Sequence, residues 1–114
     1  MKLRLLPFFL FSFGLLPAQN LISNGSFEEV RKCPKGLGEL DRAIGWSSPN
    51  GGTPDLFSSC YTRDFQTAGV PNNYFGTMAA SRGNNYAGIL HGDQEIEYLP
   101  IEIDASLVAG RHYS

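Results

Sequence analysis

The chain has 114 residues, of which 18% are charged, and its formal net charge is −2. A chain of this length forms at most one small domain. Its mildly acidic balance, without a basic run, argues against nucleic acid or an anionic membrane as a partner.

The first 19 residues have the three parts of a secretory signal peptide. Lys2 and Arg4 supply a positive start, which precedes an apolar core of 12 residues and a cleavage region ending after Ala18 or Gln19. Twelve residues are too few for a bilayer span, which needs about 20. We therefore expect residues 1–19 to be removed, which leaves 95 residues with a net charge of −4. We expect this mature chain to have no transmembrane helix and to be periplasmic, outer-membrane-associated or extracellular.

Two cysteines, Cys33 and Cys60, remain in the mature chain and allow one intramolecular pairing. In an oxidising compartment a disulfide is the default for such a pair. It would close a loop of 28 residues, which the chain-entropy model values at roughly 3.5 kcal/mol. A metal site needs more ligands than these two, and a nucleophilic cysteine does not fit an exported chain.

In chain order, residues 21–28 predict a short strand, a tight turn at Asn24-Gly25 and a second short strand. Residues 33–73 are rich in glycine and proline and lack a sustained helical period, which predicts a long loop pinned by the disulfide. Residues 86–90 form an apolar run of strand length after a Gly-Asn-Asn turn.

The C-terminal part continues the strand pattern. Aliphatic residues alternate with polar ones or proline from Leu99 to Ile103, which predicts a half-buried strand, and Pro100 places it at a sheet edge. Residues 107–110 predict a turn into a strand that starts at Arg111. With five or six strands the class is all-β. A two-sheet jelly roll needs about eight. Either another chain completes the sheet or the chain is the N-terminal part of a longer protein, and we expect the second because it is simpler.

Several segments resemble a module at the front of exported Bacteroidetes surface proteins, often followed by an OmpA-like peptidoglycan-binding domain. The matching segments lie in the same order as in that family and span nearly all of residues 20–114. They are NLISNGSFEE (20–29), GWSSP (45–49), GTPDLF (52–57), GVPNNYFG (69–76), NYAGI (85–89) and LVAG (107–110).

The resemblance implies a galactose-binding-like jelly-roll β-sandwich, similar to carbohydrate-binding modules, of which residues 20–114 are an incomplete part. It implies a non-catalytic cell-surface function, either binding of a glycan or cell-envelope component or adhesion. Two alternatives stay open. In the first, the chain is an accessory domain of a secreted hydrolase whose catalytic part lies elsewhere. In the second, it is a purely structural domain of an OmpA-like envelope protein.

The resemblance to the opening strand of carbohydrate-binding sandwiches also implies a structural calcium ion. Glu28 is the matching carboxylate, with Asn24 and Ser26 as neighbouring oxygen ligands, because calcium takes six to eight oxygens. The alternative is a solvated glutamate beside a buried Phe27.

Five residues are candidates for glycan binding. Aromatic rings pack on the C–H groups of sugars, and polar side chains bind sugar hydroxyls. The alternative for the single tryptophan is an anchoring role with its N–H bonded inside the protein. The candidates are Trp46, Tyr74, Phe75, Arg82 and Asn84.

Catalytic patterns are weak in this sequence. No Gly-x-Ser-x-Gly elbow is present. Asp93, Glu95 and Glu97 alternate with Ile96 and Tyr98, which is typical of a solvated strand face rather than of paired catalytic carboxylates. We therefore expect no enzymatic activity.

Overall fold

The computed structural model describes residues 20–63, 65–103 and 105–113. Short strands provide most of its regular structure, and the helical elements in these ranges are two single turns of 3-10 helix, η1 (Leu40–Arg42) and η2 (Pro49–Gly51). The prediction of a β-type chain is confirmed at this level. A complete jelly-roll sandwich stays a prediction.

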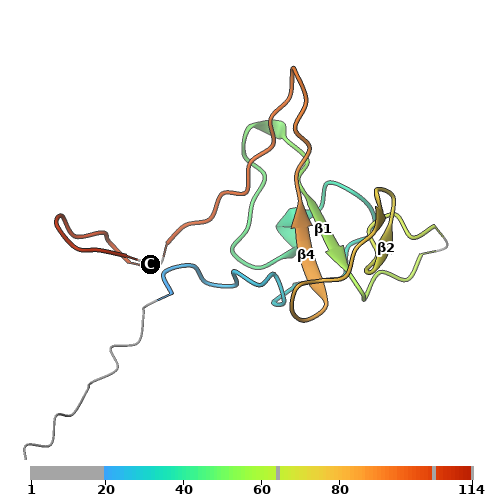
Figure 1. Ribbon diagram of the computed structural model, residues 1–114, viewed down its shortest axis with the longest axis horizontal. Coiled ribbons are helices and arrows are strands. Elements are labelled where there is room, and N and C mark those ends of the chain that lie inside the picture. The colour runs from blue at the N-terminus through green and yellow to red at the C-terminus, as the bar shows by residue number, and fades with distance from the viewer. Residues whose placement is uncertain (1–19, 64, 104, 114) are drawn as a thin grey trace, which may run out of the picture.

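Two antiparallel ribbons form the sheet structure (Figure 1). In the larger ribbon, β1 (Asp55–Ser58) pairs with β4 (Asn85–Gly88). In the smaller, β2 (Asn72–Asn73) pairs with β3 (Gly76–Thr77). A parallel bridge from the end of β1 to Gly69 brings the segment before β2 against the larger ribbon.

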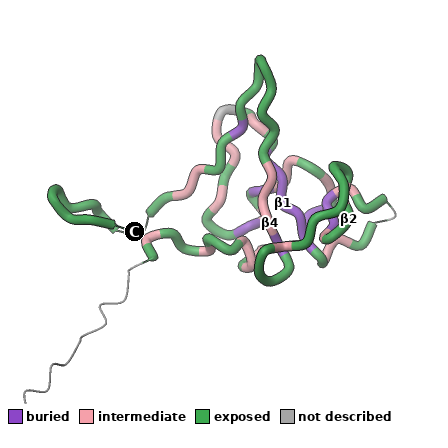
Figure 2. The backbone as a smooth tube through the Cα atoms, in the orientation of Figure 1, coloured by how far each residue is buried: buried purple, intermediate pink, exposed green. Residues whose placement is uncertain are grey.

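The hydrophobic core is small and centres on β1. Leu56 of β1 and Leu40 of η1 are both completely buried, and η1 packs against β1. The Leu40 N–H donates to the carbonyl of Pro54 at 3.1 Å, which fixes η1 beside the start of the strand. Figure 2 shows the buried residues gathered around β1 while most of the surrounding loops are exposed. The buried apolar residues are Leu40, Ala43, Leu56, Phe57 and Ala68.

The predicted disulfide between Cys33 and Cys60 is confirmed, with 5.7 Å between the two Cα atoms. It ties the segment before η1 to the residues that follow β1. The backbone N–H of Cys60 also donates to the Ser58 hydroxyl at 3.2 Å. The long loop predicted over 33–73 is thus pinned as expected, but it contains β1, which the sequence pattern did not predict.

The strands predicted over 21–28 are wrong, although the turn between them forms, with the Phe27 N–H donating to the Asn24 carbonyl. The Asn24 amide group donates to the carbonyls of Glu29 and Ile44 and accepts from the Glu29 N–H, at 2.8–2.9 Å. Because one side chain satisfies these backbone groups, the segment is held as a loop.

Near the C-terminus the chain leaves the sheet. β4 confirms the strand predicted over 86–90 but ends at Gly88. The strands predicted over 99–103 and from Arg111 are wrong within the described residues, where Ile101 makes a single bridge to Trp46. Between the end of β4 and residue 99, residues 89–98 form a projecting hairpin, which the alternation of residues in the sequence did not indicate (Figure 1).

The signal peptide predicted over 1–19 lies outside the described residues. Within the ranges that are described, no helix combines the length and the apolar character needed to cross a bilayer.

Candidate ligand-binding site

The two faces of the β1–β4 ribbon have different roles. Because successive side chains of a strand point to opposite faces, Asp55 and Phe57 share the face opposite that of Leu56. The register sets Asp55 against Gly88 and Phe57 against Tyr86 on the neighbouring strand. The Leu56 face packs on the core, so the other face is the one that can receive a ligand.

A cavity of about 360 Å³ lies on this second face, between the ribbon and the β2–β3 hairpin. Phe57, Phe75 and Tyr86 give it aromatic walls, and Met78 and Leu90 also line it. The volume falls at the lower end of the range of known small-molecule sites, about 300–1,000 Å³.

The aromatic walls are built as a connected cluster. Phe57 stacks on Tyr86, with ring centroids 5.0 Å apart, and meets the edge of Phe75 at 6.1 Å. Tyr74 contacts Phe75 edge-on at 5.3 Å and is 74% exposed at the tip of the hairpin. The Asn73 side-chain N–H donates to the Tyr86 hydroxyl at 2.5 Å, which fastens the hairpin to β4. These contacts hold a partly exposed aromatic surface beside the cavity.

Gly88 makes room for this cluster. A Cβ at position 88 would come within 2.6 Å of the Phe57 ring. Such an approach is not sterically allowed, so any larger residue would displace Phe57. The glycine thus determines where the cavity's central aromatic ring lies.

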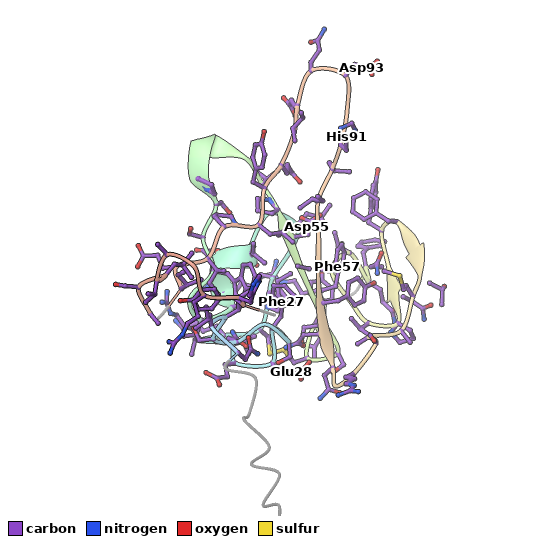
Figure 3. All side chains as sticks on the ribbon, turned by 60° about the vertical axis from the view of Figure 1, so that its left-hand side comes forward. Phe27, Glu28, Asp55, Phe57, His91 and Asp93 are labelled. Atoms are coloured by element: carbon purple, nitrogen blue, oxygen red, sulfur yellow. A yellow bond between two sulfur atoms is a disulfide. The ribbon has the colours of Figure 1, made fainter. Side chains whose placement is uncertain are left out.

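Asp55 is the acidic residue that lines the cavity, and it is only 3% exposed. Its Oδ1 accepts a hydrogen bond from the Gly38 N–H at 2.6 Å. Burial raises the pKa of Asp55; the Gly38 hydrogen bond opposes this rise, and the neighbouring charge of Glu97 adds to it. Figure 3 shows Asp55 and Phe57 near the middle of the molecule, between Glu28 at one end and Asp93 at the other.

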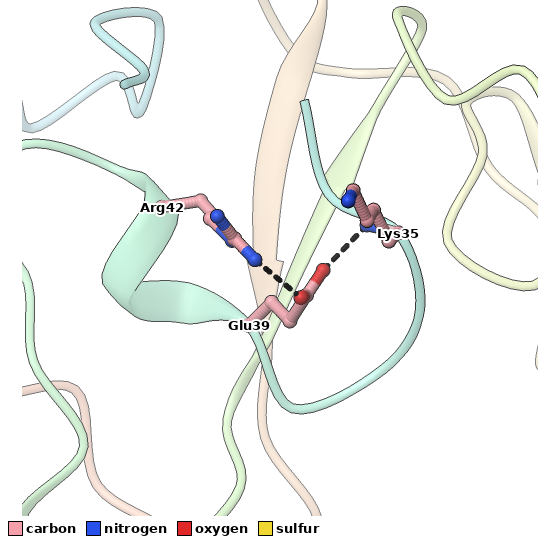
Figure 4. Close-up of polar contacts among 3 residues, drawn as sticks. All are labelled: Lys35, Glu39 and Arg42. Carbon is pink, nitrogen blue, oxygen red and sulfur yellow. Dashed lines mark hydrogen bonds and ion pairs between the residues drawn. The ribbon is translucent and has the colours of Figure 1, made fainter. Parts of the chain in front are cut away.

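The loop that carries Gly38 is itself fixed by Glu39 (Figure 4). The Glu39 carboxylate accepts hydrogen bonds from the Lys35 backbone N–H and, at 2.9 Å, from Arg42 Nη2. Burial acts to raise the pKa of Glu39, but these hydrogen bonds and the Arg42 charge lower it overall. The loop therefore presents the Gly38 N–H to Asp55 from a fixed position.

Glu97 was expected on a solvated face, and this expectation is wrong. The residue is 7% exposed, whereas its neighbours Ile96 and Tyr98 are 54% and 55% exposed. Its Oε1 accepts from the N–H and hydroxyl of Thr53, and its Oε2 accepts from the Leu90 N–H, all at 2.8–3.0 Å. The carboxylate thus clamps the 89–98 hairpin to the loop before β1 and sets the position of Leu90 in the cavity.

Of the predicted glycan-binding residues, Phe75 lines the cavity and Tyr74 lies beside it. Trp46 lies elsewhere and takes the anchoring role: its ring packs on Phe27, with centroids 4.6 Å apart, and its N–H donates to the Asn24 carbonyl at 2.9 Å. It holds the 24–27 turn.

Arg82 and Asn84 are exposed and precede β4, at the end of the ribbon away from Asp55. They do not line the cavity. The five predicted residues are therefore not one cluster, and Asp55, Phe57 and Tyr86 of the cavity were not among them. Had β1 been recognised as a strand, Asp55 and Phe57 would have been placed on the same face, because they are two residues apart.

The predicted calcium residues are tied into the backbone. Glu28 Oε1 accepts from the N–H groups of Asn84 and Asn85, both at 2.9 Å. Gly83 has φ +69°, and a Cβ there would come within 2.5 Å of the Glu28 carboxyl group, so glycine is required beside it.

Ser26 is exposed, and the Asn24 amide is engaged by the backbone as described above. No group of three or more His, Cys, Asp or Glu side chains suited to a metal ion occurs in the described part of the chain. Glu28 has a visible structural role as an anchor, and the calcium ion stays a prediction.

We found no match to this chain among protein-family models, curated proteins or solved structures. Its function has to be inferred from its own cavity and side chains.

Proposed function

We propose that this chain is a non-catalytic, exported glycan-binding module whose binding site is the cavity between the β1–β4 ribbon and the β2–β3 hairpin. The observation that carries the proposal is the combination of partly exposed aromatic rings with one buried carboxylate in a cavity of about 360 Å³.

The chemistry of the cavity suits a sugar ring. The 52% exposed ring of Phe75 offers an apolar face on which the C–H side of a pyranose can pack, and Tyr74 extends that surface outward. Asp55 supplies a hydrogen-bond acceptor for hydroxyl groups. Small-molecule sites commonly combine apolar walls with a few such polar groups, which fix the orientation of the ligand.

The same arrangement favours binding without a chemical step. Glycosidases use two carboxyl groups that flank the scissile bond. Asp55 lines the cavity, but the second buried carboxylate, Glu97, does not line it and accepts three hydrogen bonds from Thr53 and Leu90. A pair of free carboxyl groups facing one ligand is therefore not formed by these two residues.

We also propose that the two ribbons belong to a jelly-roll sandwich of which further strands cover the C-terminal part. Seven large apolar side chains between residues 96 and 113 are at least 37% exposed, and extensive exposed apolar surface on a soluble protein marks contacts with other structure. These side chains are Ile96, Tyr98, Leu99, Ile103, Leu107, Val108 and Tyr113.

The test is a glycan array of cell-wall, host and plant glycans, probed with the full chain and with two variants. Phe75→Ala removes the exposed ring of the cavity and should abolish binding. Phe65→Ala removes an 83% exposed ring that does not line the cavity and should leave binding intact. Silence of the unmodified chain across the array would contradict glycan binding and favour a structural role in the cell envelope or an accessory role beside a hydrolase.

A further inference from the structure

The cavity carries a negative charge without a basic partner. Asp55 lines it and is only 3% exposed. In the described part of the chain, the recorded ion pair is the one between Arg42 and Glu39, so Asp55 forms no salt bridge there. Buried charges are normally paired because removal from water is strongly unfavourable. Asp55, which lines the cavity without a salt-bridge partner among the described residues, is therefore the group that a cation from outside the chain would neutralise.

Asp55 has acceptor capacity left for such a cation. Glu97 uses both of its oxygens on Thr53 and Leu90. For Asp55, the recorded hydrogen bond among the described residues is the one from Gly38 to Oδ1. A carboxylate accepts about four hydrogen bonds. Asp55 is thus the group at which a ligand's charge can be met directly.

The walls of the cavity favour a cation as well. Phe57, Phe75 and Tyr86 line it, and the faces of aromatic rings attract ammonium groups, the more so when the site is shielded from water. The same rings accept the apolar face of a pyranose. A ligand that is both a sugar and a cation uses every wall of the cavity.

We propose that the ligand is a glycan with free, protonated amino groups, an unacetylated hexosamine, whose ammonium group is bound at Asp55 while its ring packs on Phe75. The inference rests on the proposed function and specifies its ligand class. N-acetylation would remove the charge and add bulk, so an acetylated sugar loses the interaction with Asp55.

The test compares glucosamine oligomers with N-acetylglucosamine oligomers of the same length by titration calorimetry on the full chain at pH 6. We expect the glucosamine oligomer to bind roughly tenfold more tightly, as a charge-assisted hydrogen bond provides, and the advantage to shrink as salt is added. Asp55→Asn should remove the advantage. Asp93→Asn, which removes the same charge at the tip of the projecting hairpin (Figure 3), should keep it.

The outcomes separate the two proposals. Equal affinity for both oligomers would overturn the amino-sugar inference and leave glycan binding standing. Binding of neither oligomer, together with a silent glycan array, would overturn both. A lysine peptide of the same length that binds as tightly as the glucosamine oligomer would show that charge alone is recognised, and this too would overturn the inference. If Asp55→Asn does not fold, the affinities of the unmodified chain for the glucosamine and N-acetylglucosamine oligomers still decide whether the inference holds.

Discussion

Asp55 and Glu97 are buried near each other, and the fold treats them in opposite ways. Glu97 accepts three hydrogen bonds, and these outweigh burial so that its pKa is lowered from its ordinary value of 4.5. Within the described ranges Asp55 accepts one hydrogen bond, from the Gly38 N–H, and burial raises its pKa above the ordinary 3.8. A carboxylate with all of its oxygens hydrogen-bonded has a structural role. A buried carboxylate whose pKa is raised because its charged form is poorly solvated is typical of a functional site.

Glu97→Gln should destabilise the fold by about 1–3 kcal/mol at pH 7, because an N–H of the new amide would face the Leu90 N–H donor or the Thr53 donors. Since the folded-state pKa of Glu97 is lowered, its contribution is present above pH 4.5 and is lost as the pH falls through the folded pKa. Urea unfolding at pH 7 and at successively lower pH values checks this. The difference between the two proteins should shrink in acid, and a constant difference would contradict the account.

Asp55→Asn should behave in the opposite way. The asparagine oxygen can still accept from Gly38, while the buried charge is gone. Since the pKa of Asp55 is raised in the fold, its ionisation lowers stability as the pH rises through that pKa. Thermal unfolding should show a variant at least as stable as the original at pH 7 and indistinguishable from it below pH 3.8. A large loss of stability at pH 7 would mean that the charge is needed structurally.

Gly88→Ala tests the packing of the cavity's central ring. The new methyl group would overlap Phe57, and forced repacking of this kind destabilises proteins by about 1–3 kcal/mol. Gly36→Ala is the matched control, because a Cβ there meets no atom within 4 Å, and surface changes of this kind fall within about 0.5 kcal/mol. Chemical unfolding of both variants provides the comparison. Equal stability of the two variants would refute the tight Gly88–Phe57 contact.

Among the elements, β4 was predictable and β1 was not, for a physical reason. β4 begins at the last residue of a Gly-Asn-Asn turn and continues into the apolar run 86–90, and both features are local signals. β1 has all four residues buried, so it shows no alternation of polar and apolar side chains, and it lies among glycines and prolines. Its strand conformation comes from pairing with β4 and packing on η1, which are contacts between distant parts of the chain.

The disulfide, which links the segments on either side of η1 and β1, was predicted directly from the sequence. It encloses β1 and η1 within a loop of 28 residues, and the chain-entropy model gives it roughly 3.5 kcal/mol of stability. A Cys33→Ser/Cys60→Ser variant should therefore unfold at a markedly lower urea concentration. Reductant should lower the midpoint of the original protein and leave that of the variant unchanged. Two reactive thiols in the untreated original protein would contradict the pairing.

At the scale of the whole molecule, the sequence indicated a strand-rich chain with long irregular segments, and the structure agrees. The candidate site followed from the sequence only in part. Tyr74 and Phe75 were predicted because exposed aromatics next to Asn and Pro are a local signal. Asp55 and Tyr86 become neighbours only through the antiparallel register of β1 and β4, which no local pattern specifies.

Binding of a glycan in the cavity between the larger ribbon and the β2–β3 hairpin can be located residue by residue. Amide chemical shifts recorded by NMR during titration with a glucosamine oligomer show which residues the glycan contacts. We predict that the shifting amides cluster at β3 and at residues 86–90, while those around Trp46 and η1 stay in place. Shifts centred on Trp46 would contradict the assignment of the site, and an unchanged spectrum together with a silent glycan array would contradict glycan binding.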